Sequence, residues 1–213
     1  MAIVANTLIG RASGSVGNAT FSQWKGLNIL KAKIAVMTNP RSSLQQANRA
    51  RFVALLGYAK LWRPILQFGF KEYAGRMSWM NRFMSVNSPN GFLQWNDLDA
   101  AWLTHPEQLV IAEGSLFPTP IVVSDADTAS IVVNFPGTAT NNQATNDRVF
   151  VLVSTQNETK FMLGTVTRAD GSATIPLSGG SVDDPYFVSV FFVSNDGRIV
   201  SNSITLTGTL AAP

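Results

Sequence analysis

From about residue 110 onward, the chain is a series of short runs of β-branched and aromatic residues separated by turn residues. Runs of this length are typical of strands, which usually hold about five or six residues. Asp170-Gly171 and Asn195-Asp196-Gly197 are strong turn signals between runs. Seven runs are expected to be strands, the number in an immunoglobulin-like sandwich: residues 121–123, 131–135, 149–154, 161–167, 173–175, 187–193 and 201–206.

The resemblance to immunoglobulin domains is one of architecture only. The sequence has no cysteine, so the Cys…Trp…Cys pattern of antibody domains is missing. The same absence excludes a disulfide framework, thiolate catalysis and a cysteine-ligated metal.

Residues before about 92 predict helices. Asn39-Pro40 interrupts the chain, and serines at 42–43 lie three residues before glutamines at 45–46, which is a capping-box start for a helix. Pro64 is expected to end or kink this helix. Its apolar face is expected to contain Leu44, Ala47, Phe52, Leu55, Leu56, Ala59 and Trp62.

One or two further helical pieces are expected over residues 65–70 and 72–86, and a turn in residues 87–91. Met77, Met80 and Met84, with Trp79 and Phe83, form an apolar stripe on this second piece. Such a stripe is usually core, and a subunit interface where nothing covers it.

The first 38 residues predict an extended arm. Residues 19–24 and 27–34 alternate between apolar and polar, which predicts a β-hairpin turning near Lys25-Gly26. The predicted fold class is therefore α+β, with an N-terminal β-hairpin arm and helices followed by a C-terminal immunoglobulin-like antiparallel β-sandwich. We expect a basic arm and helical region over residues 1–109 and an acidic sandwich over residues 110–213.

The charges are strongly segregated along the chain. Up to Phe92 there are twelve basic residues and one acidic residue, Glu72, a net charge of +11. From Leu93 onward there are four basic and twelve acidic residues, a net charge of −8. This asymmetry indicates either that the first half faces a polyanion or that neighbouring subunits attract head to tail.

Candidate chemistry is sparse. His105 is the only histidine, beside Glu107, and has no second histidine or cysteine with which to bind zinc. Gly10, Gly14 and Gly17 lack the spacing of a phosphate-binding loop, so turns and close strand approach are favoured for them. Calcium is a weaker alternative to solvated turn carboxylates for three aspartate pairs, none at EF-hand spacing: Asp97/Asp99, Asp125/Asp127 and Asp183/Asp184.

Almost end to end, the chain resembles a large uncharacterised family of bacterial proteins, a domain of unknown function whose members also occur in bacteriophage genomes. The resemblance implies helices plus a β-sandwich, no catalytic residues, and a virion component. It rests on the order of these motifs: Trp24-Lys25-Gly26, Asn39-Pro40 with Gln45 and Arg49, Phe68-Gly69-Phe70-Lys71, Glu113-Gly114-Ser115-Leu116, Asp147, Phe191-Phe192-Val193-Ser194, Asp196-Gly197 and Ser201-Asn202-Ser203.

The predicted function is that of a non-enzymatic structural or assembly protein, a bacteriophage virion component associated with capsid, portal, neck or tail. No cofactor or metal is expected. The expected partners are other structural proteins and further copies of the chain, with non-specific DNA contact as a possibility and no membrane. The residues expected to contact a polyanion or a neighbouring subunit are Lys25, Lys31, Lys33, Arg41, Arg49 and Arg51.

Two other function classes stay open: a non-specific nucleic-acid-binding protein using the basic half, and a surface adhesion or carbohydrate-binding module using the sandwich loops. The N-terminus is a poor match to a signal peptide, and no apolar stretch has the length of a membrane-spanning helix. We therefore expect a product made in the host cytoplasm and placed in the virion, with the cytoplasm or cell surface as alternative locations.

Overall fold

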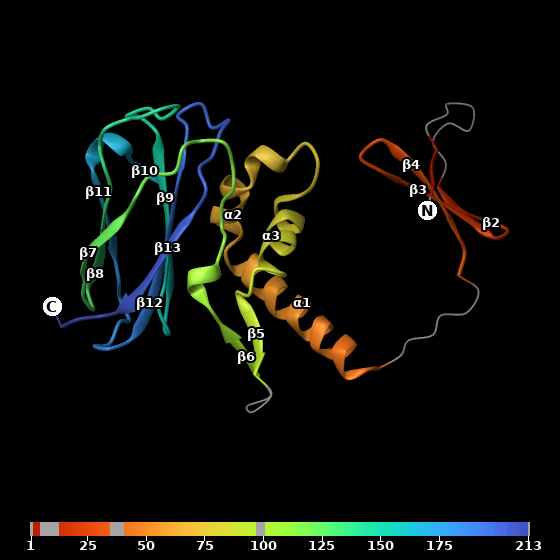
Figure 1. Cartoon of the computed structure of the whole chain (residues 1–213), viewed down its shortest axis with the longest axis horizontal. Coiled ribbons are helices and arrows are strands. Elements are labelled where there is room, and N and C mark those ends of the chain that lie inside the picture. The colour runs from red at the N-terminus through yellow and green to blue at the C-terminus, as the bar shows by residue number, and fades with distance from the viewer. Residues whose placement is uncertain (1, 5–12, 35–40, 97–100, 213) are drawn as a thin grey trace. The chain divides into compact units, whose positions relative to one another are not determined.

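The computed structural model describes residues 2–4, 13–34, 41–96 and 101–212. It divides the chain into two compact units, Met1–Gln45 and Gln46–Pro213 (Figure 1). Arg11, Gly10, Asn39-Pro40, Asp97 and Asp99 lie outside the described residues.

The N-terminal unit contains one antiparallel sheet. Its strands are β1 (Ala2–Val4), β2 (Gly14–Val16), β3 (Ala19–Trp24) and β4 (Leu27–Ala32), in the order β1-β4-β3-β2. The predicted hairpin is present, because β3 and β4 pair from Ala19↔Ala32 to Trp24↔Leu27. Lys25 and Gly26 join the two strands with φ of 46° and 82°, the left-handed conformation that a two-residue hairpin turn of type I′ requires.

The second unit contains all seven predicted sandwich strands. One sheet has the order β10-β9-β12-β13 and the other has the order β11-β8-β7. Every pairing between the strands of these two sheets is antiparallel, so the α+β class with an immunoglobulin-like sandwich is confirmed. The strands are β7 (Val122–Ala126), β8 (Ser130–Asn134), β9 (Arg148–Ser154), β10 (Thr159–Thr167), β11 (Ser172–Pro176), β12 (Pro185–Val193) and β13 (Ile204–Thr209).

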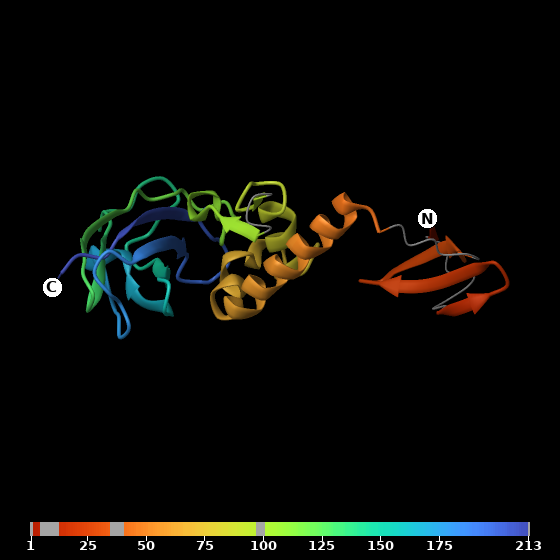
Figure 2. The ribbon, with the colours of Figure 1, turned by 90° about the horizontal axis from the view of Figure 1, so that it is seen from below.

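Strands β9 and β12 are apolar on both faces because both faces are covered. Val149, Val151 and Val153 alternate into the core between the two sheets. Phe150 and Leu152 alternate into a second core that contains the helices. The unit therefore has three layers, with the β10-β9-β12-β13 sheet in the middle, and the helices lie beside this sheet in both views (Figures 1 and 2).

The helical layer consists of α1 (Ser43–Leu61), α2 (Arg63–Gly69), the short 3-10 helix η2 (Lys71–Tyr73) and α3 (Trp79–Asn87). Ser42 accepts a hydrogen bond from the N–H of Gln45 at 3.3 Å, as its capping role predicts. Pro64 lies in the first turn of α2, where a missing N–H costs nothing. Its predicted effect on the helix is confirmed, since α1 ends at Leu61.

A second hairpin, β5 (Leu93–Asn96) with β6 (Ala101–Thr104), follows the helices and was not predicted. The 3-10 helices η3 (Pro106–Gln108) and η4 (Arg168–Asp170) complete the described elements.

The division at residues 45/46 differs from the predicted boundary between residues 109 and 110. Leu55, Ile65 and Phe83 of the helices belong to the same buried cluster as Phe150 and Phe191 of the sandwich. Because the helices and the middle sheet bury one another's apolar faces, residues 46–213 form a single body, called the helix–sandwich body below.

Candidate functional site

The sheet of the N-terminal unit carries apolar side chains that are not buried in the described residues 13–34. Directly paired residues share a face, so Val16, Ala19, Phe21 and Leu30 lie on one face of the sheet. Phe21 and Leu30 are half-buried and Val16 is 72% exposed. None of residues 13–34 is buried. A sheet of this size ordinarily needs a second layer against its apolar face, so this surface is suited to a partner.

Three of the predicted interaction residues lie around this sheet and are exposed. Lys25 occupies the hairpin turn, with its Nζ 5.5 Å from the centroid of the Trp24 ring. Lys31 pairs with Thr20 on the face opposite Phe21. Lys33 follows β4, and its backbone N–H donates to Asn18 O at 2.7 Å.

The other three predicted residues lie at the start of α1. Arg41 precedes the helix and Arg49 is exposed on it. Arg51 is half-buried and donates from Nη2 to Asn48 Oδ1 at 3.4 Å. The six residues fall in two units, four in the first and two in the second. A common interaction surface for all six stays a prediction.

The apolar face of α1 is covered at only one end. Leu55, Ala59 and Trp62 are buried, as predicted for that face. Leu44 and Phe52 continue the same stripe toward the helix N-terminus and are 71% and 57% exposed. The first turns of α1 thus present a second uncovered apolar surface, which the spacing of the residues did not distinguish from the core.

Hydrogen bonds of Glu72 and Glu113 connect the helical layer to the sandwich, and this region is called the joint below. Glu72, the only acidic residue before Leu93, accepts at Oε1 from the N–H groups of Ser115 (3.0 Å) and Val200 (2.6 Å). A Cβ on Gly114 would lie 2.3 Å from that same Oε1. Glycine is therefore required for the close approach of the two segments.

A second carboxylate strengthens the joint. Glu113 binds Arg82 of α3 at 2.6–3.0 Å through both carboxylate oxygens and accepts the Tyr73 hydroxyl at 2.9 Å. The guanidinium also lies 4.2 Å from the centroid of the Tyr73 ring. The hydrogen bond to Glu113 raises the pKa of Arg82, and burial, with Glu113, raises the pKa of Tyr73.

The joint unites motifs that lie far apart in the sequence. Gly69 O accepts from Glu113 N at 3.1 Å, and Leu116 N donates to Val200 O at 2.9 Å. Ser203 Oγ accepts from the N–H of Ile111 at 3.0 Å. The Phe68–Lys71, Glu113–Leu116 and Ser201–Ser203 motifs of the family resemblance thus meet in one place.

A family model covers nearly all of this arrangement, matching residues 11–207. The chain belongs to DUF6266, a family of unknown function. The predicted membership of an uncharacterised domain family is confirmed. No curated protein matches the chain.

Two solved structures similar to this DUF6266 chain each match less than half of it. A myokine structure is 16% identical with a TM-score of 0.34, and the match covers 46% of this chain and 99% of that one. The FN1–FN3 domains of chicken CNTN1 are 10% identical with a TM-score of 0.35, over 47% of this chain and 32% of that one. At this level of similarity, neither indicates what the DUF6266 chain binds.

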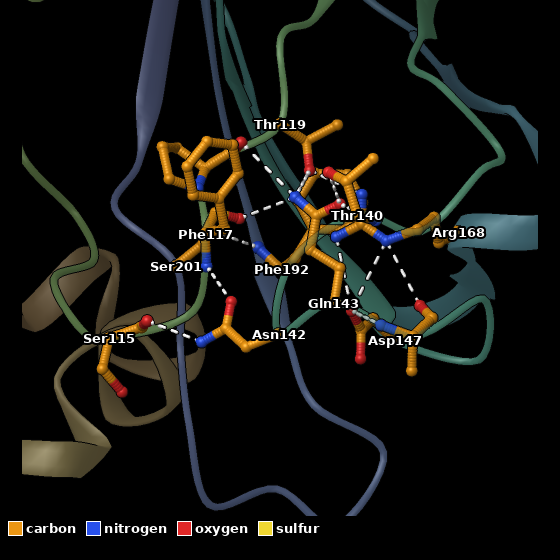
Figure 3. A network of polar contacts seen from close by, with 12 residues as sticks. Ser115, Phe117, Thr119, Thr140, Asn142, Gln143, Asp147, Arg168, Phe192 and Ser201 are labelled. Atoms are coloured by element: carbon orange, nitrogen blue, oxygen red, sulfur yellow. Dashed lines mark hydrogen bonds and ion pairs between the residues drawn. The ribbon is translucent and has the colours of Figure 1, made fainter.

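A buried ion pair organises the loops at one end of the DUF6266 sandwich (Figure 3). Arg168 and Asp147 are 0% and 1% exposed, with Nη2 and Oδ2 3.3 Å apart. Arg168 also donates to Ala144 O (3.2 Å) and to Thr119 Oγ1 (2.5 Å), and it lies 4.2 Å from the centroid of the Phe192 ring. Burial lowers the pKa of Arg168, and Asp147 opposes this effect.

Two amides extend this network to the neighbouring chain segment. Asn142 accepts from Phe117 N and donates to Ser115 O, both at 2.9 Å, and Gln143 donates to Phe117 O at 2.9 Å. Figure 3 shows both side chains reaching across to this segment. The network binds loop to loop, so these polar groups are occupied within the fold.

His105 lies near the surface beside Glu107, with Nδ1 3.2 Å from Oε1 and a side-chain exposure of 35%. The side chain of His105 makes no other hydrogen bond or ion pair with a described residue. The absence of enzymatic activity stays a prediction.

One described aspartate in each of two candidate calcium pairs caps a turn. Asp127 Oδ1 accepts from the N–H groups of Ala129 and Ser130, and Asp184 Oδ2 accepts from Ser181 N at 2.9 Å. In the described part of the chain, no three histidine, aspartate or glutamate side chains are grouped so that they could hold a metal ion. Asp97 and Asp99 lie outside that part.

The methionine stripe packs into the body. Phe83 is fully buried, and Trp79, Met80 and Met84 pack against the cluster shared with the sandwich. The prediction of a core stripe is therefore confirmed for these residues. None of the helices in the described residues is both long and apolar enough to cross a membrane.

Proposed function

We propose that this protein is a non-enzymatic assembly subunit that docks through its N-terminal sheet and presents the helix–sandwich body. The observation that carries the proposal is the exposure of the sheet. None of residues 13–34 is buried, although β2, β3 and β4 bring Val16, Ala19, Phe21 and Leu30 onto one face. Stable interfaces bury such an apolar centre within a polar rim.

A second copy of the chain is the proposed partner. No acidic residue occurs before Glu72, whereas residues 93–213 contain twelve acidic and four basic residues. The exposed lysines on and beside this sheet therefore complement the sandwich of a neighbouring copy. Such a contact joins two different surfaces, so repeating it yields a closed ring or an open filament. A bacteriophage virion is the assembly that the sequence resemblance alone favours.

The test compares two triple charge reversals in the full chain. Lys25, Lys31 and Lys33 are changed to Glu in one variant. Lys60, Arg63 and Arg76, which are exposed on the helix–sandwich body, are changed to Glu in the matched control. Light scattering after size exclusion is measured at about 50 mM and about 500 mM salt, because screening weakens contacts between exposed charges.

We expect the wild type and the control to assemble at low salt and the lysine variant to stay monomeric or to dissociate at least tenfold more readily. A wild type that is monomeric at every concentration tested contradicts self-assembly. If that monomer binds a labelled oligonucleotide and the lysine reversal abolishes binding, the nucleic-acid alternative replaces the proposal.

A further inference from the structure

The helix–sandwich body contains a cavity of about 670 Å³ between the helical layer and one end of the middle sheet. Tyr58 of α1 and Phe92 line one side, and Phe187 and Thr207 of β12 and β13 line the sheet side. Ligand sites for small molecules usually have volumes of about 300–1,000 Å³. The cavity therefore has room for a molecule of a few rings.

Aromatic rings form a continuous wall of this cavity. Tyr58 and Phe92 have centroids 5.4 Å apart in an edge-on arrangement. Trp62 lies behind them, 4.8 Å from Tyr58 and 5.9 Å from Phe187. Because Trp62 is buried among these rings, the wall is held in place by packing and is preformed.

The rest of the lining is rich in neutral hydrogen-bonding groups that the fold does not use. Among the described residues, no partner accepts from or donates to the side chains of Thr104, Gln156, Thr207 or Thr209, or to the phenol of Tyr58. Burial raises the pKa of the Tyr58 phenol, so this phenol stays protonated at neutral pH.

The charge of the lining restricts the ligand further. Among the described residues, no lysine or arginine lines the cavity, and Glu107 is the only carboxylate that does. A phosphate, nucleotide or other anion would therefore meet no counter-charge. A purely apolar ligand would leave the hydroxyl and amide groups unpaired, which costs binding free energy.

We propose that this cavity is a binding site for a short neutral saccharide. The apolar face of a sugar ring packs on the aromatic wall, and its hydroxyl groups pair with the threonine, glutamine and tyrosine side chains. The proposal is independent of the assembly function, since every lining residue belongs to the helix–sandwich body.

The test is calorimetric titration of the full chain with cellobiose, maltose, lactose and N,N′-diacetylchitobiose, with glucuronic acid as an anionic comparator. The variants are Thr207→Val and Tyr58→Phe, each of which removes one hydroxyl at nearly constant shape. Thr174→Val, at an exposed position on β11 in the other sheet, is the matched control. Thermal unfolding of each variant verifies that it is folded.

We expect at least one of the disaccharides to bind, and glucuronic acid to bind more weakly. Thr207→Val and Tyr58→Phe should each raise the dissociation constant about five- to tenfold, the loss expected for one hydrogen bond, while Thr174→Val leaves it unchanged. No heat from any disaccharide at about 20 mM, or equal affinity in all variants, overturns the proposal. Binding of indole or an apolar peptide without any disaccharide binding also overturns it.

Discussion

The helix–sandwich body buries its apolar residues, whereas the described residues of the N-terminal sheet leave theirs at least partly exposed. In the body, β9 and β12 bury side chains on both faces, between a second sheet and the helices. In residues 13–34, four or more apolar side chains share a sheet face and none is buried. Hydrophobic burial is the main favourable term in folding, so the body accounts for its own stability and the sheet does not.

The charges follow the same contrast. The body contains ion pairs between its own residues, such as the buried Arg168–Asp147 pair and the Arg82–Glu113 pair. Lys25, Lys31 and Lys33 are exposed around a sheet that has no carboxylate in its own unit. A region with spare apolar surface and one sign of charge is suited to contacts between molecules.

The largest expected effect is a loss of stability, and it should differ between the two regions when the same substitution, Phe→Ala, is made in each. Phe191→Ala removes a ring that is fully buried and stacked 5.2 Å from Phe150, so we expect unfolding to become easier by about 3–5 kcal/mol. Phe21→Ala in the N-terminal sheet removes a half-buried ring and should cost less than about 1 kcal/mol. Urea unfolding followed by circular dichroism measures both. Equal losses would show that the sheet has a core of its own.

Two glycines sharpen the comparison within the body. A Cβ on Gly69 would lie 2.1 Å from Ile111 O, so Gly69→Ala must push the joint apart and should cost about 3 kcal/mol. Gly57, inside α1, has nothing within 4 Å of a Cβ, so Gly57→Ala should instead stabilise by about 0.5–1 kcal/mol. Midpoints of thermal unfolding should move in opposite directions. A shared direction would contradict the close approach at Gly69.

Asn87 tests the polar part of the joint between helices and sandwich. Its side chain donates to Val110 O at 2.8 Å and accepts from Val110 N at 2.9 Å, and it is 1% exposed. Asn87→Ala leaves buried backbone groups unpaired, which should cost about 2 kcal/mol. Asn81→Ala, at an exposed position of the same helix, is the control and should change stability by less than about 0.5 kcal/mol. Similar losses in both variants would mean that water replaces the Asn87 contacts.

Sequence patterns predicted the secondary-structure elements better than the tertiary contacts and burial of their side chains. All seven sandwich strands and the hairpin at Lys25-Gly26 were predictable, because alternation and turn residues are local signals. Asn87 was interpreted as a turn residue, since nothing local indicates that its side chain pairs with Val110. Likewise, helical spacing placed Phe52 and Leu55 on one face, but only the tertiary fold decides that Leu55 is buried and Phe52 exposed.

Neither the joint nor the cavity could be predicted from the sequence, and the reason is the same for both. Glu72, Gly114 and Val200 meet across more than a hundred residues of chain, and only the folded chain brings them together. Thr207 and Tyr58 carry no motif, and their common cavity depends on how α1 packs against the sheet. The division of charge along the chain could be found from the sequence, because charged residues can be counted without a structure.

The smallest expected effect is a difference between the regions in their response to acid. Residues 13–34 contain no carboxylate, so protonation of carboxylates can act only on the body. Burial by itself raises the pKa of Glu158 in the body, but hydrogen bonds from Ser178 N, Gly179 N and Lys160 hold that pKa below its ordinary value of 4.5. The Ser178 and Gly179 bonds, at 2.6 and 3.0 Å, fix a neighbouring loop.

Because the folded pKa of Glu158 is depressed, the stabilisation it provides is complete above the unfolded value and is lost as the pH falls below it. The wild type should therefore lose more stability than Glu158→Gln between about pH 6 and about pH 3, although it starts more stable. Asp125→Asn is the control, since that carboxylate has no hydrogen bond to another described residue. Urea midpoints across the pH range measure the difference. A parallel acid response in the wild type and Glu158→Gln would mean that the loop contacts do not depend on the charge of Glu158, and that the body loses stability in acid through other carboxylates.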